Sequence, residues 1–188
     1  MKTWIILAIL AAAVIYVVAV FNRLVRQRNM VREGWSGIDV QLKRRTDLVP
    51  NLVEAVKGYA AHERAVLAEV TAMRASSVAA NDVGSQASAA RGLQASLGKL
   101  FAVAEAYPDL KADKNFLDLQ QQLAGVEDQL QMARRYYNGT VRNLNIAIQS
   151  FPANLLAGLL GFHTEPFFEL DDRSQAAAPN IAFQAPNP

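Results

Sequence analysis

The chain contains no cysteine, and this absence excludes several kinds of site. Without thiols there is no disulfide framework, no thiolate nucleophile and no cysteine-ligated zinc. Histidine is also scarce. Of the two histidines, His62 lacks the second histidine four positions on that a zinc-binding helix needs, and His163 lies far away in the sequence. The sequence therefore predicts no metal site.

Recognisable catalytic motifs are missing as well. The sequence has no glycine-rich phosphate loop, no nucleophile elbow and no pair of carboxylates placed as in a catalytic cleft. The formal net charge is only +2, and much of the basic charge follows a long apolar run. This distribution gives little support for nucleic-acid binding. We therefore expect neither an enzyme nor a nucleic-acid partner.

What the chain does have is an uncharged apolar run over residues 3–21. A hydrocarbon core of about 30 Å needs about 20 apolar helical residues, so this run is long enough to cross a membrane. The alternative is a cleaved secretory signal, whose apolar region usually covers about 7 to 15 residues and ends at a small-x-small site. This run is longer, and Val18-Ala19-Val20 is a poor cleavage site. We expect an uncleaved anchor over residues 1–22.

The charges around this run predict its orientation. One lysine precedes it and several arginines follow it closely, so the positive-inside rule places the bulk of the chain in the cytoplasm. This predicts a single-pass protein of the cell inner membrane, in contact with lipid. The residues expected at the membrane interface are Lys2, Trp4, Arg23, Arg26 and Arg28.

The soluble part has the apolar spacing of long helices. From Phe116 to Phe151 apolar residues recur three and four positions apart, which predicts one helix with Tyr137 in its core-facing stripe and Asn138 at a bend. The same phase runs from Leu24 to Met73 straight through Pro50. It predicts a kinked but nearly continuous helix to about residue 78. Five further residues are candidates for structural roles. Asp47 could cap a helix that restarts at Pro50, and His62 and Glu63 are expected in a polar network. The other two are Trp35 and Pro108.

Residues 75–90 lose large apolar side chains and are predicted to be a loop or a frayed helix end. A shorter helix then ends before Pro108, and after residue 151 a short apolar helix is closed by Gly161 and followed by the extended segment PFFEL. From the helix lengths, the apolar end near Gly161 is expected to lie far from lipid, where it would cap the bundle or contact a second subunit.

The predicted fold class is thus all-α. A single N-terminal transmembrane helix precedes an elongated antiparallel bundle of three long helices plus a short C-terminal helix, over residues 23–170. Residues 171–188 are predicted to be a flexible tail, with plain disorder favoured over docking through Ile181 and Phe183.

Several strings also resemble the LemA family. They are IDVQLKRRTDLVPNLV, AEAYPDLKA, and FP shortly before GF, and the resemblance covers roughly residues 20–170. It implies one N-terminal span, a cytoplasmic helical bundle, and no catalytic residues or cofactor. It also implies association with other membrane proteins, including membrane-bound metalloproteases of the heat-shock type.

Two functions remain open at this point. The favoured one is a membrane-anchored, non-enzymatic scaffold that forms homo-oligomers through its helical surfaces, as in a coiled coil. The alternative is an adaptor or sensor that binds a membrane protease or signalling partner. The candidate protein-contact residues are Lys43, Arg44, Arg45, Phe167 and Phe168.

Overall fold

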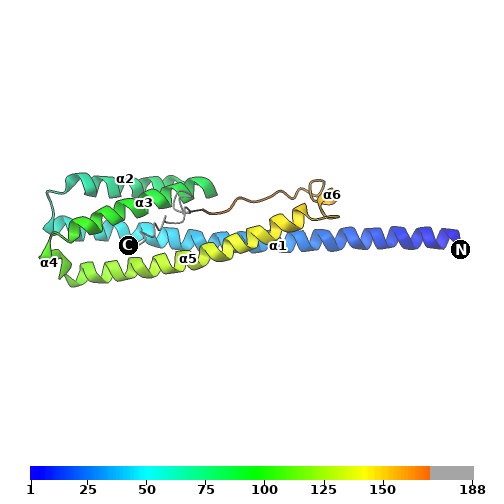
Figure 1. Ribbon diagram of the computed structural model, residues 1–188, viewed down its shortest axis with the longest axis horizontal. Helices are drawn as coiled ribbons and strands as arrows, with labels where there is room; N and C mark the ends of the chain where they lie inside the picture. Colours follow the sequence, from blue (N-terminus) through cyan, green and yellow to red (C-terminus); the bar gives the residue numbers. More distant parts are fainter. Residues whose placement is uncertain (170–188) are drawn as a thin grey trace, which may run out of the picture.

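Helix α1 (Lys2–Tyr59) extends from the N-terminus to the opposite end of the molecule, and the other helices form a bundle around its second part (Figure 1). The computed structural model describes residues 1–169. No strand occurs in this part of the chain, which confirms the all-α class. The other helices are α2 (Arg64–Ala79), α3 (Val83–Ala104), α4 (Pro108–Lys111), α5 (Lys114–Gln149) and α6 (Asn154–Ala157).

The bundle contains four long helices rather than the three predicted. Helix α1 ends at Tyr59 instead of near residue 78, because the chain leaves the helix at Ala60 (φ −124°, ψ 47°) and turns back. The turn is closed by a hydrogen bond from the amide of Glu63 to the carbonyl of Ala60 (3.0 Å). The apolar phase that continues to Met73 therefore belongs to a separate helix, α2, which packs against both α1 and α3.

The loop predicted over residues 75–90 is also wrong, since only residues 80–82 separate α2 from α3. Asp82 caps α3 by accepting a hydrogen bond from the amide of Ser85 (2.9 Å), and the hydroxyl of Ser85 accepts one from the amide of Asp82 (3.2 Å). At Gly92, a Cβ would lie 2.9 Å from the sulfur of Met73. The small residues here reflect close packing of α2 on α3, not irregular chain.

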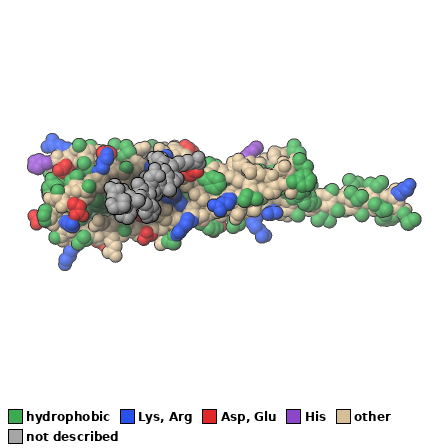
Figure 2. Space-filling model, in the orientation of Figure 1, with side chains coloured by type: hydrophobic (Ala, Val, Ile, Leu, Met, Phe, Trp, Pro, Cys, Tyr) green, Lys and Arg blue, Asp and Glu red, His purple; other side chains and the backbone are tan. Residues whose placement is uncertain are grey.

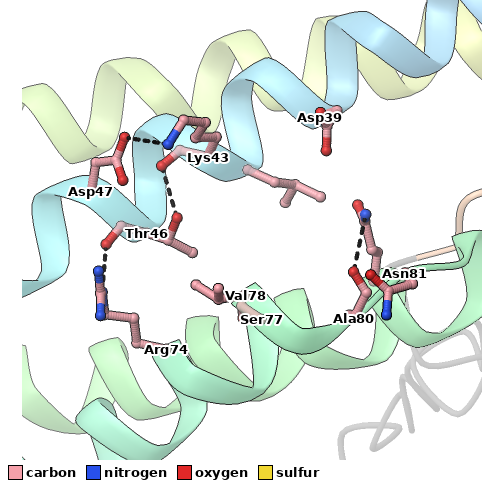
Figure 3. Close-up of a pocket in the computed structure, with 11 residues that line it drawn as sticks. Asp39, Lys43, Thr46, Asp47, Arg74, Ser77, Val78, Ala80 and Asn81 are labelled. Atoms are coloured by element: carbon pink, nitrogen blue, oxygen red, sulfur yellow. Dashed lines mark hydrogen bonds and ion pairs between the residues drawn. The ribbon is translucent and has the colours of Figure 1, made fainter.

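Pro50 lies inside α1, so the prediction of a helix that continues through it is confirmed. Asp47 is not a cap. It lies within the same helix and pairs with Lys43 (3.4 Å). Proline has no amide hydrogen, which deprives the carbonyl of Thr46 of its α-helical donor. The Nε of Arg74 on α2 donates to that carbonyl instead (2.9 Å; Figure 3).

Helix α5 fits the sequence prediction closely and begins at a cap, where Asp113 accepts from the amide of Phe116 (2.9 Å). Its apolar stripe faces α1 along almost its whole length. Leu123 lies in a core at the far end of the bundle with residues of α1, α2 and α3. Tyr137 and Leu144 lie in a second core, nearer the N-terminal half of α1, with residues of the C-terminal segment.

The chain after α5 lies beside the end of the apolar run rather than far from it. At about 1.5 Å per residue, α5 is about 54 Å long, and α1 from Phe21 to its end measures about 57 Å. The α2–α3 hairpin lets α5 start at the far end and return over this whole length. The ring of Phe162 packs edge-on against Phe21 (5.8 Å between centroids). The expectation that the Gly161 end lies far from lipid is therefore wrong if α1 is the anchor.

The segment after α5 has the short apolar helix, the glycine turn and the extended chain that were predicted, but its helix is shorter than expected. The apolar helix is α6, of four residues, and Gly161 with φ of 73° closes the turn after it. Positive φ at this position favours glycine. From Phe162 the chain runs extended, back along the bundle (Figure 1). The predicted tail, residues 171–188, lies outside the described residues.

Candidate functional site at the end of the apolar run and along α5

The N-terminal part of α1 touches almost no other part of the protein. Of the helices in residues 1–169, α1 is the one that is long and apolar enough to cross a membrane. Residues 1–16 are all exposed, and the first buried side chain is Val20. Trp4 lies near one end of the apolar run with 76% of its surface exposed. Figure 2 shows this part as a thin apolar extension of a thicker body.

At the other end of the run, two of the predicted interface arginines are exposed and one is engaged by the protein. Arg23 and Arg26 face solvent, whereas the guanidinium of Arg28 lies over the ring of Phe162, 4.8 Å from its centroid. This is the geometry of a cation–π contact. Arg28 thus links α1 to the turn that follows α6.

Arg45, the last of the three consecutive basic residues at 43–45, is not available for a protein partner. Its side chain is 3% exposed, and its Nη2 lies 3.1 Å from Oε2 of Glu127 on α5. Burial lowers the pKa of Arg45, and the carboxylate of Glu127 raises it. Glu127 is the acidic partner that an arginine in an apolar stripe requires. Lys43 and Arg44 remain on the surface, the former paired with Asp47.

Phe168 is also a core residue rather than a contact residue. It is fully buried and packs edge-on against Trp35 (5.9 Å between centroids), while Phe167 is 42% exposed. The amide group of Asn138 makes both backbone hydrogen bonds of Phe168, donating to its carbonyl (3.1 Å) and accepting from its amide (2.9 Å). The expected docking pair is therefore divided between the core and the surface.

Asn145 holds the extended segment in the same way, one heptad further along α5. Its side chain donates to the carbonyl of Glu165 (2.9 Å) and accepts from its amide (2.9 Å). This role was not predicted, although two asparagines seven positions apart share one helix face and so give a usable signal. Asn138 thus fixes the segment, and α5 continues as a helix through it.

Tyr137 is a core residue, as predicted, and is 1% exposed. Its ring packs on Trp35 (5.5 Å between centroids), and its hydroxyl donates to the carbonyl of Pro166 (2.9 Å). Burial, with a smaller contribution from the charge of Glu165, raises the pKa of Tyr137 to about 12.

The polar network expected around His62 is not formed. His62 is exposed in the turn between α1 and α2. Glu63 instead accepts a hydrogen bond from the hydroxyl of Tyr107 (3.1 Å), which ties this turn to the chain just before α4. Pro108 begins α4, where a missing amide hydrogen costs nothing.

A surface hollow of about 470 Å³ lies between α1 and the α2–α3 turn (Figure 3). Its lining includes two acidic and two basic side chains. Lys43 pairs with Asp47, and Arg74 binds the carbonyl of Thr46. The hollow therefore presents no concentration of charge of one sign. Over residues 1–169, no three acidic or imidazole side chains lie close enough together to hold a metal ion.

A second stripe on α5 faces outward and carries no charge. It has the heptad spacing of the buried stripe, and its members are exposed except for one glycine, which is half-buried. Met132 and Tyr136 are each 46% exposed and Ile146 is 55% exposed. We call this the outer stripe; it comprises Gln122, Gly125, Gln129, Met132, Tyr136, Gly139, Asn143, Ile146 and Ser150.

Comparison with known proteins agrees with this architecture. The model of the LemA family matches residues 34–183. The chain belongs to the LemA family. It is 28% identical to Protein LemA of Metamycoplasma hominis, in a match that covers 80% of this chain and 69% of that protein.

This LemA family member is also similar to magnetosome proteins. It is 25% identical to MamQ 1 and MamQ 2 of Paramagnetospirillum magneticum and 24% identical to MamQ of Magnetospirillum gryphiswaldense. Each match covers 79% of this chain and 64% of the MamQ protein. The chain therefore spans less than two thirds of the length of these relatives.

Proposed function

We propose that this LemA family protein is a single-pass inner-membrane scaffold that performs no catalysis and self-associates through the outer stripe of α5. The observation that carries the proposal is the stripe itself, which runs uncharged over residues 122–150 on the outside of the bundle. A helix of a monomeric bundle normally presents charged residues on its outer face. Two apolar or uncharged stripes on one helix indicate two neighbours.

The surface beside the outer stripe suits the approach of another helix. Tyr136 lies against α1, with its Cδ1 3.3 Å from where a Cβ of Gly34 would stand. Further along, Gln122, Gly125 and Gln129 of the stripe line a surface hollow together with Arg44, Asp47 and Leu48 of α1. Helices pack at axis separations of about 8–10 Å when small residues and aromatic or aliphatic side chains interdigitate, as this surface allows.

The membrane anchor adds a geometric constraint. Copies that share one membrane stand parallel and at the same height, so the outer stripe of one copy meets the same residues of its neighbour. This is the self-complementary arrangement of a symmetric dimer. It also raises the effective concentration of the copies and so favours weak association.

The alternative proposal is an adaptor that binds another membrane protein, such as a membrane protease. Its expected contact residues have less support, because Phe168 is buried and Arg45 is paired with Glu127. Phe167, Lys43 and Arg44 are the members of that set which remain exposed, although Lys43 is paired with Asp47.

Cysteine cross-linking in isolated membranes tests self-association directly, because the chain has no cysteine of its own. Met132→Cys should give a dimer with a short bis-maleimide, whereas Val78→Cys on α2 should not. The two positions are comparably accessible, at 46% and 63%. Equal cross-linking at both, or none at either, would contradict the proposed contact.

A charge in the outer stripe provides a second test of the same proposal. Tyr136→Glu should lower the molar mass measured by light scattering in detergent, because it brings two like charges together at a symmetric contact. Gln121→Glu, also exposed on α5 but outside the stripe, is the matched control and should leave the mass unchanged.

A further inference from the structure

Residues 151–160, which connect α5 to the Gly161 turn, form an exposed apolar surface beside α1. Phe151 is 80% exposed, Leu155 is 63% exposed and Leu159 is 86% exposed. The segment contains no charged side chain. An isolated exposed leucine needs no explanation, but three large apolar side chains within ten residues form a patch of the kind that marks an interaction site.

The position of this patch along α1 is fixed by the residues around it. Phe151 lines a small hollow together with Tyr16 and Val20, which lie within the apolar run. Phe162 packs on Phe21, the last residue of that run. The patch therefore lies level with the final part of the predicted span, over about 7 Å of helix from Tyr16 to Phe21.

A depth of this size matches that of interfacial segments, which enter the acyl boundary by about 5–10 Å. The hydrocarbon core is about 30 Å thick, about the length of the whole run, so the level of Tyr16 to Phe21 is the outermost part of that core. If α1 crosses the membrane with residues 3–21, the body of the bundle lies in water and residues 151–160 lie at the boundary. Figure 2 shows apolar side chains gathered at this end of the body, where the thin extension begins.

The charges near the patch agree with that placement. Arg23 lines the same hollow as Phe151, and Arg28, seven residues beyond Phe21, lies over Phe162. Arginine at this level can bind lipid phosphate while the apolar side chains enter the acyl boundary. A water-facing loop would leave these side chains exposed without any partner.

We propose that residues 151–160 are a second membrane contact, which inserts Phe151, Leu155 and Leu159 into the interfacial layer of the bilayer that α1 crosses. The partner is the lipid surface, and the contact lies in the interface without spanning it. The inference rests on the anchor role of α1. It is independent of self-association through the outer stripe.

Fluorescence quenching in vesicles tests this contact with the full chain. Single cysteines are placed at Leu159, at Val78 on α2 as the exposed control, and at Ile15 within the span as the control for insertion. Each is labelled with a small environment-sensitive dye and reconstituted into vesicles of phosphatidylcholine and phosphatidylglycerol. Lipids that carry a nitroxide near the head of the acyl chain report contact with lipid, and iodide reports contact with water.

The lipid quencher should reduce emission at Leu159 at least about twofold more than at Val78, because interfacial segments enter the acyl boundary by about 5–10 Å. Iodide should show the opposite order. A label at Leu159 that iodide reaches as readily as Val78 would overturn the proposal. So would a label that neither quencher reaches, which would place a second protein subunit on the patch.

Quenching at Ile15 separates this proposal from the role of the anchor. Strong lipid quenching at Ile15 with none at Leu159 rejects only the second contact. No lipid quenching at Ile15 rejects the anchor and the second contact together. A double variant, Leu155→Ser with Leu159→Ser, should make a dye at Phe151→Cys more accessible to iodide, whereas Val78→Ser should leave that accessibility unchanged.

Discussion

Arg74 on α2 donates a hydrogen bond from its Nε to the carbonyl of Thr46 on α1 (2.9 Å), the group that Pro50 leaves without an α-helical donor. A proline can thus lie inside a helix of 58 residues because a neighbouring helix satisfies the carbonyl it releases. The same bond attaches α2 to α1, so the proline and the packing of the hairpin are linked.

A double-mutant cycle tests this link. Arg74→Ala should lower the free energy of unfolding by about 1–2 kcal/mol, because it leaves a partly buried carbonyl unsatisfied. In a Pro50→Ala background the same change should cost less, since the amide of the new alanine can donate to Thr46. Urea unfolding followed by circular dichroism measures all four free energies. Strictly additive effects would show that the two residues act independently.

The pair of Arg45 and Glu127 should behave as a buried ion pair. Arg45→Met leaves Glu127 partly buried without its partner, and Glu127→Met leaves a buried guanidinium, which should cost about 3–5 kcal/mol. The double variant should lose less than the sum of the two, because no uncompensated charge is left. The measurement is again urea unfolding. A double variant as unstable as that sum would contradict the pairing.

Gly34 should be a position where a single methyl group is not tolerated. A Cβ there would lie 3.0 Å from the Cα of Tyr137, so Gly34→Ala must push α1 and α5 apart. We expect a loss of about 1–3 kcal/mol. Gly58→Ala, in the same helix with nothing within 4 Å, should instead add about 0.5–1 kcal/mol. Thermal unfolding in nanodiscs would show melting temperatures that shift in opposite directions.

Tyr137 should make the bundle sensitive to alkali. Its pKa in the folded protein is raised to about 12, whereas an unfolded tyrosine titrates near about 10. The raised value favours the folded state below pH of about 10, and this contribution is lost as the pH rises toward 12, by up to about 1.4 kcal/mol per pH unit. Unfolding free energies of the wild type and Tyr137→Phe, measured from pH 8 to 11.5, should differ in slope only above pH of about 10.

Apolar periodicity predicted helix α5 most clearly, because its stripe is buried along the whole helix. Phe116, Leu123, Leu130 and Tyr137 all lie in that buried stripe. Periodicity gave a wrong prediction at Ala60. The chain reverses over residues 60–63, which include no glycine or proline, and the apolar residues of α2 happen to continue the heptad phase of α1. Periodicity also failed at residues 83–90, because small residues that let α2 and α3 approach resemble those of a loop. The capping box of Asp82 and Ser85 was the available signal for the start of α3.

The candidate contact residues were harder to predict, because exposure depends on tertiary register. Arg45 lies in an apolar stripe, where it requires an acidic partner, and Phe168 lies in a short segment without helical periodicity. Arg45 is buried against Glu127 of α5, and Phe168 is buried against Trp35 of α1. Which residue pairs with Arg45 follows from the register of α1 against α5, and no local pattern contains that register. The outer stripe was not predicted, although its spacing and lack of charge are present in the sequence, because its outward orientation follows from the structure.

The absence of any joint in α1 between residues 2 and 59 has a mechanical consequence. A helix without an interruption transmits tilt, so a reorientation of its apolar end by about 10° would sweep the far end of the bundle sideways by roughly 10 Å over the remaining 57 Å or so. With α1 as the proposed anchor, a change in bilayer thickness that alters the tilt of this helix would be converted into a change in the lateral position of α4 and of the turn at His62.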